Sequence, residues 1–346
     1  MGIRTAVAHT LERTLGKSIT RNVKQAEFAA RRRIIDVLDV EAKAARRMAE
    51  KRAAEPKPSA AQKRAELIEA LGRRTLDESV NQEDLKWATN DPFVPHPPAN
   101  MTRHQVLAEL HRLLIPRTYF EIGVRWGDSL ALSGTRSIGV DPDFKIRSEL
   151  NCDLRTFAQT SDEFFARADA FEHFSGIPID LAFIDGMHLS EYALRDFINV
   201  EKSCHRGSVV IFDDVLPRNH LEAYRIRRTK SWAGDVYKLH DVLRRLRPDL
   251  VLVPLNTKPT GTLVVANLDP GSTVLDEALP TLVDELTAPD PQMVPEEIMT
   301  RAVAVDPERL LASDVWARAV EMRDGFASAS EFAEFWEELR ALPCLG

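Results

Sequence analysis

Three aspartates follow apolar runs of this sequence, at positions where carboxylates can do chemistry. Asp185 comes directly after Ile179–Ile184, and Asp213 and Asp214 come directly after Ser208–Phe212. The carboxyl ends of parallel strands face the ligand crevice of an open α/β sheet, so these side chains are expected there. Three carboxylates at one place repel one another unless a cation lies between them. Their oxygens suit a hard divalent cation, most simply Mg²⁺, although Asp213 or Asp214 could instead satisfy only turn amides.

His188 lies three residues beyond Asp185. If the chain turns into a helix there, the imidazole faces the same cavity, and a group that titrates near neutral pH suits a general base for a hydroxyl. A metal would lower the pKa of that hydroxyl, so the two effects would add. The alternative is a residue at a helix start without a catalytic role. Zinc chemistry and a hydrolase triad are not expected, because there is no Cys/His zinc spacing and no nucleophile elbow at Ser129 or Ser190.

A segment with two glycines overlaps the end of the apolar run Tyr119–Val124 and reads Glu121-Ile-Gly123-Val-Arg-Trp-Gly127-Asp-Ser129. Glycine lets the backbone turn sharply and approach a ligand closely. We expect a helix directly after this segment, with its positive N-terminus directed at the same place. The spacing G-x-x-x-G differs from the G-x-G-x-x-G of dinucleotide-binding proteins, which disfavours an NAD-dependent oxidoreductase.

Asp141 follows the next apolar run, Ser137–Val140, and lies 20 residues after Glu121. An acidic residue at this place is positioned to accept hydrogen bonds from both ribose hydroxyls. A turn-forming aspartate before Pro142 is the alternative. The glycine segment, the strand and the acid together indicate a nucleoside-binding unit.

Seven short apolar runs alternate with helical patterns, which predicts an α/β fold with a mainly parallel sheet covered on both faces. The runs are Tyr119–Val124, Ser137–Val140, Leu154–Thr160, Ile179–Ile184, Ser208–Phe212, Leu250–Leu255 and Thr262–Asn267. Helical patterns lie over Leu189–Ser203 and Ala233–Leu246. A short turn with Pro259 and Gly261 separates the last two runs, so we expect a hairpin whose last strand is antiparallel.

These motifs resemble those of class I, Rossmann-like, S-adenosylmethionine-dependent methyltransferases over about residues 105–270. The first two are Tyr119-Phe-Glu121-Ile-Gly123-Val-x-x-Gly127-x-Ser129 and Gly139-Val-Asp141-Pro142. The later ones are Thr160-Ser-Asp-Glu-Phe-Phe165, Ala182-Phe-Ile-Asp-Gly-Met-His188 and Gly207-Ser-Val-Val-Ile-Phe-Asp-Asp214. The later motifs are similar to a bacterial O-methyltransferase group that includes macrolide-sugar enzymes, in which the cofactor is S-adenosylmethionine and the metal is Mg²⁺.

The resemblance implies roles for individual residues. Those implied at the cofactor are Glu121, Gly123, Gly127, Ser129, Asp141, Thr160, Ser161, Asp162 and Asp185, with Asp141 on the ribose hydroxyls and residues 160–162 near the adenine. Asp162 has an alternative role as the N-cap of the next helix. In the strand order of this class the fourth and fifth strands are neighbours, about 4.8 Å apart. Asp185, Asp213 and Asp214 would then meet as metal ligands, with His188 beside them as the base.

The rest of the chain reads as helical additions. We expect a helical N-terminal extension and linker over 1–95, the methyltransferase domain over 96–270 and a helical region over 271–346, with individual helices over Gln25–Arg52 and Ala60–Arg74. One helical stripe indicates core or dimer contact and consists of Phe332, Phe335, Trp336 and Leu339. A basic stretch is expected to be solvated, or else to bind an acidic acceptor or cap the pocket, and consists of Arg225, Arg227, Arg228 and Lys230.

Charge and cysteine content exclude several classes of protein. The net charge is −7, but residues 1–75 hold 18 Lys and Arg against 9 Asp and Glu, which leaves −16 for the remainder. An acidic main body argues against a dedicated nucleic-acid binder. Three cysteines without a C-x-x-C pair suit a reducing cytoplasm. Neither a signal peptide nor an apolar run long enough to span a membrane is present in the sequence. We expect a cytoplasmic enzyme, dimeric through its apolar helices.

The predicted function is an S-adenosylmethionine-dependent, Mg²⁺-assisted O-methyltransferase that acts on a hydroxyl of a small molecule or sugar. The first alternative keeps the fold without the metal, as a metal-independent O- or N-methyltransferase. The second is a non-catalytic nucleoside-binding scaffold. The scaffold is disfavoured because an inert protein has no reason to hold three carboxylates and a histidine at one end of a sheet.

Overall fold

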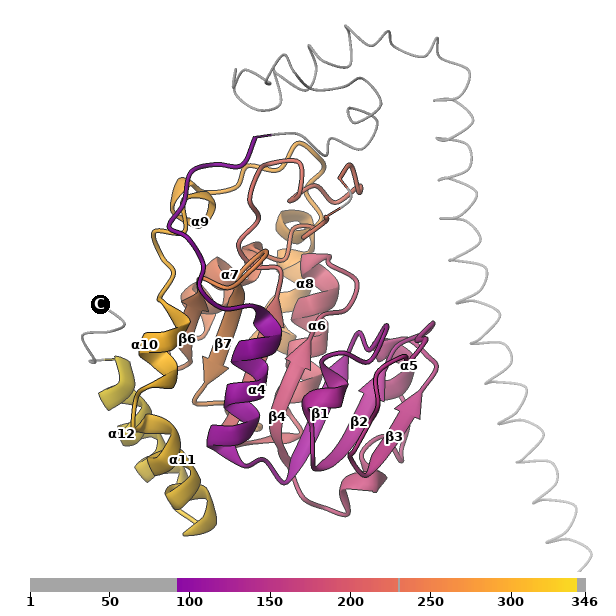
Figure 1. The fold of residues 1–346 in the computed structure, drawn as a ribbon, viewed down its shortest axis with the longest axis vertical. Coiled ribbons are helices and arrows are strands. Elements are labelled where there is room, and N and C mark those ends of the chain that lie inside the picture. The colour runs from indigo at the N-terminus through magenta and orange to yellow at the C-terminus, as the bar shows by residue number, and fades with distance from the viewer. Residues whose placement is uncertain (1–91, 230, 341–346) are drawn as a thin grey trace, which may run out of the picture. The chain divides into compact units, whose positions relative to one another are not determined.

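A seven-stranded sheet forms the centre of the computed structural model, which describes residues 92–229 and 231–340 (Figure 1). The strands are β1 Thr118–Ile122, β2 Arg136–Val140, β3 Leu154–Phe157, β4 Ile179–Ile184, β5 Cys204–Asp213, β6 Val251–Leu255 and β7 Thr262–Ala266. Their order is β3-β2-β1-β4-β5-β7-β6, and β7 alone runs antiparallel to its neighbours. The predicted mostly parallel sheet with an antiparallel last strand is therefore confirmed. Six of the predicted runs contain one strand or most of one, and Ser208–Phe212 covers half of β5.

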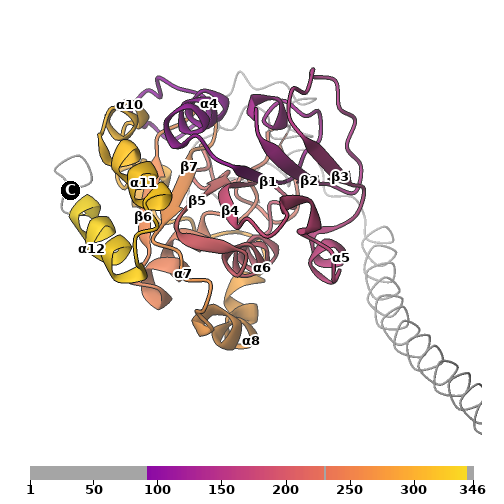
Figure 2. The same ribbon diagram turned by 90° about the horizontal axis from the view of Figure 1, so that it is seen from below.

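Helices cover the sheet on both faces, as continuous apolar strands require. One face packs against α5 Ser161–Phe165, α6 Ser190–Glu201, α7 Lys238–Leu246, α8 Val274–Leu286 and α9 Glu296–Met299, with η2 Glu172–Phe174. The other face packs against α4 Arg103–Leu114, α10 Pro307–Leu311, α11 Val315–Asp324 and α12 Ala329–Arg340, with η1 Leu130–Leu132. Figure 2 shows the two helical layers with the sheet between them. The helices expected over Gln25–Arg52 and Ala60–Arg74 lie outside the described residues.

The connection from β1 to β2 differs from the prediction. The expected helix after the glycine segment is wrong, because only the three-residue 3₁₀ helix η1 lies between these strands. The chain turns sharply here, with positive φ at Gly123, Arg125 and Gly127. Few residues then remain before β2 begins at Arg136. A single 3₁₀ turn has almost no macrodipole, so this loop lacks the positive helix end that the sequence suggested.

The C-terminal stripe is part of the core. Phe332, Phe335 and Trp336 are all buried, and α12 packs against β5 and β6. The indole of Trp336 donates to the carbonyl of Arg206 at 2.9 Å. These three side chains therefore favour the core interpretation over a dimer contact, while the side chain of Leu339 lies outside the description. Among the described residues, no helix combines the length and apolarity that crossing a membrane requires.

Candidate active site

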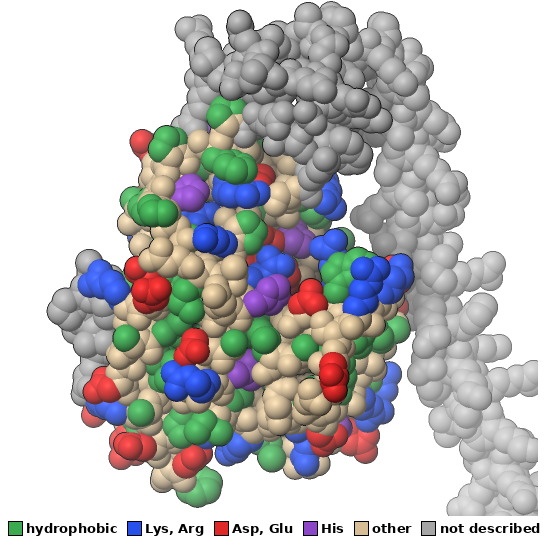
Figure 3. All heavy atoms as spheres, viewed as in Figure 1, with side chains coloured by type: hydrophobic (Ala, Val, Ile, Leu, Met, Phe, Trp, Pro, Cys, Tyr) green, Lys and Arg blue, Asp and Glu red, His purple; other side chains and the backbone are tan. Residues whose placement is uncertain are grey.

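Four of the predicted site residues meet at the carboxyl ends of β4 and β5. The parallel register places Ile184 beside Phe212, so the residues that follow both strands lie together. His188 Nδ1 lies 2.6 Å from Asp214 Oδ2, and His188 Nε2 lies 3.6 Å from Asp185 Oδ1. The structure thus brings Asp185, His188 and the Asp213–Asp214 pair to one edge of the sheet. Figure 3 shows charged and histidine side chains gathered near the middle of the face that it displays.

Backbone strain accompanies this arrangement. His188 has φ +56° and Asp214 has φ +63°, a left-handed conformation that side-chain-bearing residues rarely adopt. Each such residue costs on the order of 1–3 kcal/mol and persists only where the surrounding structure imposes it. Both partners of the His188–Asp214 contact carry this strain. The fold therefore directs the two side chains toward each other at an energetic cost.

The acidic cluster carries more negative charge than its surroundings compensate. Burial and repulsion by Asp214 raise the pKa of Asp185 to about 6, and burial with repulsion by both other aspartates raises the pKa of Asp213 well above its usual value. Burial also disfavours the charged form of Asp214, but the hydrogen bond from His188 overcomes this and lowers its pKa. Burial likewise opposes protonation of His188, yet Asp214 raises its pKa to about 9.

The cluster has donor atoms that suit a divalent cation. Asp185, His188 and Asp214 each offer one ligand atom, and these atoms lie within 4.8 Å of one another. The side chain of Asp213 is 1% exposed, and neither of its buried oxygens receives a well-formed hydrogen bond from a described residue. Asp213 Oδ1 has no hydrogen-bond partner among the described residues, and a buried polar atom in that state calls for an explanation such as an ion. Hard carboxylate oxygens are the ligands that Mg²⁺ prefers, so these residues fit it.

Two residues that the sequence did not suggest complete the cluster. Arg103, the first residue of α4, places Nη1 2.8 Å from Asp213 Oδ2 and Nη2 3.9 Å from Asp185 Oδ2. Thr260, in the turn between β6 and β7, donates its hydroxyl to Asp214 Oδ1. Nothing in the sequence near Arg103, apart from the helix N-cap residue Thr102, could have predicted its contact with the aspartates. Thr260 had a sequence signal, because a hairpin that pairs with β5 brings its turn to the end of that strand.

The glycine loop lies directly against this cluster. Gly123 has φ +93°, and a Cβ there would lie 1.9 Å from the carbonyl oxygen of Asp185. Gly127 has φ +81°, and a Cβ there would meet Ile146 at 3.2 Å. Both positions require glycine, because of their positive φ and their close packing. Gly123 brings the loop into contact with the backbone of Asp185.

Asp141 holds the glycine loop in place. Its carboxylate accepts the backbone N–H of Arg125 at 2.8 Å and that of Asp143 at 2.7 Å. The second bond is the turn-forming interaction that was the alternative for this residue. A carboxylate has about four acceptor positions, so the turn leaves room for ribose hydroxyls at the same group.

Glu121 and Ser129 lie behind the glycine loop rather than on it. Glu121 is 0% exposed, and its oxygens accept the hydroxyls of Tyr119 and Ser129, both at 2.6 Å. Burial raises the pKa of Glu121 to about 8, against the opposing hydrogen bonds of these hydroxyls. In this conformation both predicted cofactor residues support the loop from within the core.

The third predicted cofactor segment begins α5 and is tied to α6. Thr160 is the N-cap and forms a capping box with Glu163, so the proposed N-cap role of Asp162 is wrong. Asp162 instead pairs with Arg195. Ser161 hydrogen-bonds to the buried Asp196, whose pKa rises to about 7 through burial and repulsion by Asp162. This segment follows β3, which β2 and β1 separate from β4, so it lies apart from the acidic cluster along the sheet edge.

A segment that we call the roof, residues 216–229 and 231–237, packs against His188. The Trp232 ring stacks on the imidazole with centroids 5.2 Å apart and planes at 24°. A Cβ at Gly234 would lie 1.7 Å from the His188 carbonyl oxygen, so only glycine fits there. Arg225 holds the roof in place through ion pairs with Glu191 and Asp235.

The expectation that the whole basic stretch is solvated is therefore wrong at Arg225, whose side chain is 16% exposed. Arg227 and Arg228 are exposed. Lys230 lies outside the described residues.

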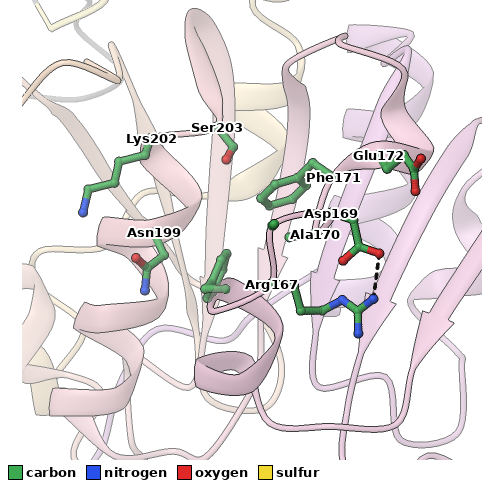
Figure 4. Close-up of a pocket in the computed structure, with 10 residues that line it drawn as sticks. Arg167, Asp169, Ala170, Phe171, Glu172, Asn199, Lys202 and Ser203 are labelled. Carbon is green, nitrogen blue, oxygen red and sulfur yellow. Dashed lines mark hydrogen bonds and ion pairs between the residues drawn. The ribbon is translucent and has the colours of Figure 1, made fainter. Parts of the chain in front are cut away.

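A pocket of about 520 Å³ lies away from the acidic cluster, between the segment after α5 and the C-terminal end of α6 (Figure 4). Its cations already have partners, since Arg167 pairs with Asp169 and Lys202 pairs with Asp276. It is far from the carboxyl ends of the strands, because α6 begins at that edge and runs away from it. The strained and under-compensated cluster, not this pocket, is the candidate active site.

Comparison with known proteins agrees with the motifs. Residues 120–215 match a family described as "Methyltransferase domain". No curated protein matches the chain in sequence.

Similar solved structures include an O-methyltransferase from Bacillus cereus in complex with SAH, with 18% identity, coverage of 62% of this chain and 93% of that one, and a TM-score of 0.32. They also include the O-methyltransferase TomG from Streptomyces achromogenes, with 16% identity, coverage of 62% and 92%, and a TM-score of 0.35.

The matched segment runs from β1 past the end of β5, so it contains the glycine loop and all three aspartates of the cluster. The strand order and the antiparallel β7 are those expected from the motifs. Residues 120–215 of this chain are therefore similar to a methyltransferase domain, and they lie within a Rossmann-like sheet flanked by helices.

Proposed function

We propose that this protein transfers the methyl group of S-adenosylmethionine to a hydroxyl oxygen of a small molecule or sugar, with Mg²⁺ assistance. One observation carries the proposal. The close approach of Gly123 to the Asp185 carbonyl brings the glycine loop near the His188–Asp214 pair, which supports the proposal. A cofactor on that loop would have its reactive end next to a base and three carboxylates. Such an arrangement suits transfer to an oxygen that must lose a proton.

The protein's part in this reaction is alignment and proton transfer. The sulfonium methyl is already activated, so the acceptor oxygen needs to lie in line with it at about 3 Å. His188 Nδ1 faces Asp214, which holds the ring and leaves Nε2 to take the hydroxyl proton. A bound Mg²⁺ would be held by Asp185, Asp213 and Asp214, would acidify the acceptor hydroxyl and would fix its position.

The charge of the carboxylates also sets the state of His188. Because Asp214 and its neighbours raise the pKa of His188 to about 9, the ring keeps its proton near pH 7 while they are uncompensated. Positive charge added at the carboxylates lowers this pKa and frees Nε2 as an acceptor. Trp232 stacks on one face of the imidazole and covers that face.

Two measurements test the proposal. Calorimetry of S-adenosylhomocysteine with the full chain should show binding, and transfer of labelled methyl to a panel of hydroxylated sugars and phenols should show turnover that a chelator suppresses. His188→Gln should abolish turnover and leave cofactor binding intact. His173→Gln is the matched control, because His173 contacts Asp153 away from the site. Absence of S-adenosylhomocysteine binding to the wild-type chain would contradict the proposal.

A metal-independent methyltransferase is the second candidate, and Arg103 favours it. The guanidinium already places a positive charge 2.8 Å from Asp213, so part of the repulsion among the carboxylates is compensated without an ion. Full turnover after exhaustive chelation would select this candidate. Restoration of lost turnover by added Mg²⁺ would select the first.

A further inference from the structure

The cation that contacts Asp213 in this structure is Arg103. Its guanidinium approaches Asp213 and Asp185 from the start of α4, and the charges of all three aspartates favour its protonated form against the cost of burial. Arg103 is 27% exposed, whereas the Asp213 side chain is 1% exposed. Arg103 therefore lies on the solvent side of the carboxylate that it neutralises, where a side chain can leave without disturbing the core.

The contact between Arg103 and Asp213 is close but poorly matched. Neither oxygen of Asp213 receives a well-formed hydrogen bond, and the buried Nε of Arg103 has no acceptor among the described residues. Arg117 and Asp180 show the opposite case. There Nε and Nη2 donate to the two carboxylate oxygens at 2.8 and 2.7 Å, and the backbone N–H of Arg117 adds a third bond at 2.7 Å. Bidentate pairing gives geometric specificity, which the Arg103 contact lacks.

A fourth carboxylate, exposed to solvent, also acts electrostatically on Arg103. Asp128, in the loop after β1, is exposed and is among the charges that raise the pKa of Arg103. Ser148 donates its hydroxyl to Asp128 Oδ1 at 2.6 Å, which holds this carboxylate in place. The charge of Asp128 therefore attracts Arg103 from outside the cluster, in addition to the charges of the three aspartates.

We propose that Arg103 is a displaceable counter-ion, which neutralises Asp213 when no metal is bound and moves toward Asp128 when a divalent cation binds the cluster. This inference rests on the metal-assisted form of the proposed function. Arg103 and the cation compete for the same carboxylates, so each weakens the binding of the other. Arg103 would keep the empty cluster stable enough to fold and bind the nucleoside.

Calorimetric titration of the full chain with Mg²⁺ and with Mn²⁺ tests the proposal without a need for turnover. Arg103→Gln should bind the cation about tenfold more tightly than wild type, which is within the usual range of coupling between sites. Its melting temperature should fall without the cation and recover when the cation saturates. Arg112→Gln is the matched control, because Arg112 lies on the same helix and pairs with the exposed Glu109. It should bind the cation as wild type does.

Asp128→Asn gives a prediction of opposite sign and keeps the test valid if Arg103→Gln fails to fold. Without the outer carboxylate, Arg103 should remain on Asp213 and cation binding should weaken severalfold. Equal or weaker cation binding by Arg103→Gln, or unchanged or tighter binding by Asp128→Asn, overturns the proposal. Parallel titration with S-adenosylhomocysteine separates the two hypotheses, since its failure to bind would reject the methyltransferase function and leave the cation result standing.

Discussion

The two ends of strand β4 hold aspartates in surroundings of opposite character. Asp180, near the start of the strand, is 3% exposed and meets Arg117, His205 and Arg323. Although burial opposes its ionisation, the hydrogen bonds from Arg117 and His205 lower the pKa of Asp180 well below its usual value. Asp185, just past the other end, has a raised pKa, and so has Asp213 beside it.

The difference lies in the partners and not in the burial. Both oxygens of Asp180 accept hydrogen bonds from cations, whereas neither oxygen of Asp213 receives a well-formed one. A buried carboxylate whose oxygens accept well-formed hydrogen bonds stabilises the fold. A buried carboxylate whose oxygens lack them can instead bind a ligand. Here α11 reaches the Asp180 end through Arg323, while the Asp185 end faces the glycine loop. The comparison predicts that substitutions at the two ends separate stability from activity.

The largest effect is expected at His188. His188→Gln keeps the size and polarity of the side chain but removes the base, so kcat should fall by about 10²–10⁴-fold. The free energy of unfolding should fall by less than in Asp180→Asn, because the Gln amide can still donate a hydrogen bond to Asp214. Initial rates with the best acceptor, together with urea denaturation, measure both quantities. A fall in stability that parallels the fall in kcat would place His188 with Asp180 as a structural residue.

Asp180→Asn should show the reverse pattern. Removing one partner of a buried ion pair leaves Arg117 and Arg323 without their carboxylate, which costs about 3–5 kcal/mol of unfolding free energy. The kcat of the folded fraction, counted by S-adenosylhomocysteine titration, should equal that of wild type. Because the folded-state pKa is lowered, the stabilisation by Asp180 is present above the unfolded pKa of about 3.9 and is lost as pH falls below it. A destabilisation that stays constant down to pH 2 contradicts this assignment.

Glu121 should give a pH dependence of the opposite sign. Its pKa is raised to about 8, so its contribution to stability is present below its usual pKa of 4.5 and is lost as pH rises through 8. Glu121→Gln should therefore gain stability relative to wild type as pH increases from 5 to 8, by at most about 1.4 kcal/mol for each pH unit. Thermal unfolding at four pH values measures the trend. A flat difference between the two proteins would show that Glu121 is ionised in the folded state.

The smallest effect is expected at Thr260. Thr260→Val removes the hydroxyl that donates to Asp214, and the loss of a hydrogen bond to a charged group should lower kcat about tenfold. Thr260→Ser keeps the donor and should restore most of the rate. Both variants should unfold at similar denaturant concentrations. If the serine variant is as slow as the valine variant, the methyl group of Thr260 matters and its hydroxyl does not.

Local patterns in the sequence determined the sheet and the positions of its strand ends. Apolar runs predicted all seven strands, and the turn with Pro259 and Gly261 predicted the antiparallel β7. Because parallel strands bring their carboxyl ends to one edge, the same pattern placed Asp185, His188 and the Asp213–Asp214 pair together. These features follow from hydrophobic period and chain direction, which short segments carry by themselves.

Only the tertiary structure decided how the cluster is compensated. Arg103 comes from a helix that precedes β1, and Thr260 comes from a turn after β6, so neither is near the aspartates in sequence. Several residues of the loop after β1 have a left-handed backbone conformation, and a single 3₁₀ turn forms where a helix was expected. Such contacts depend on how α4 and the β6–β7 hairpin pack beside β5. Packing joins residues across long sequence separations, and no local pattern encodes which side chain will meet a given carboxylate.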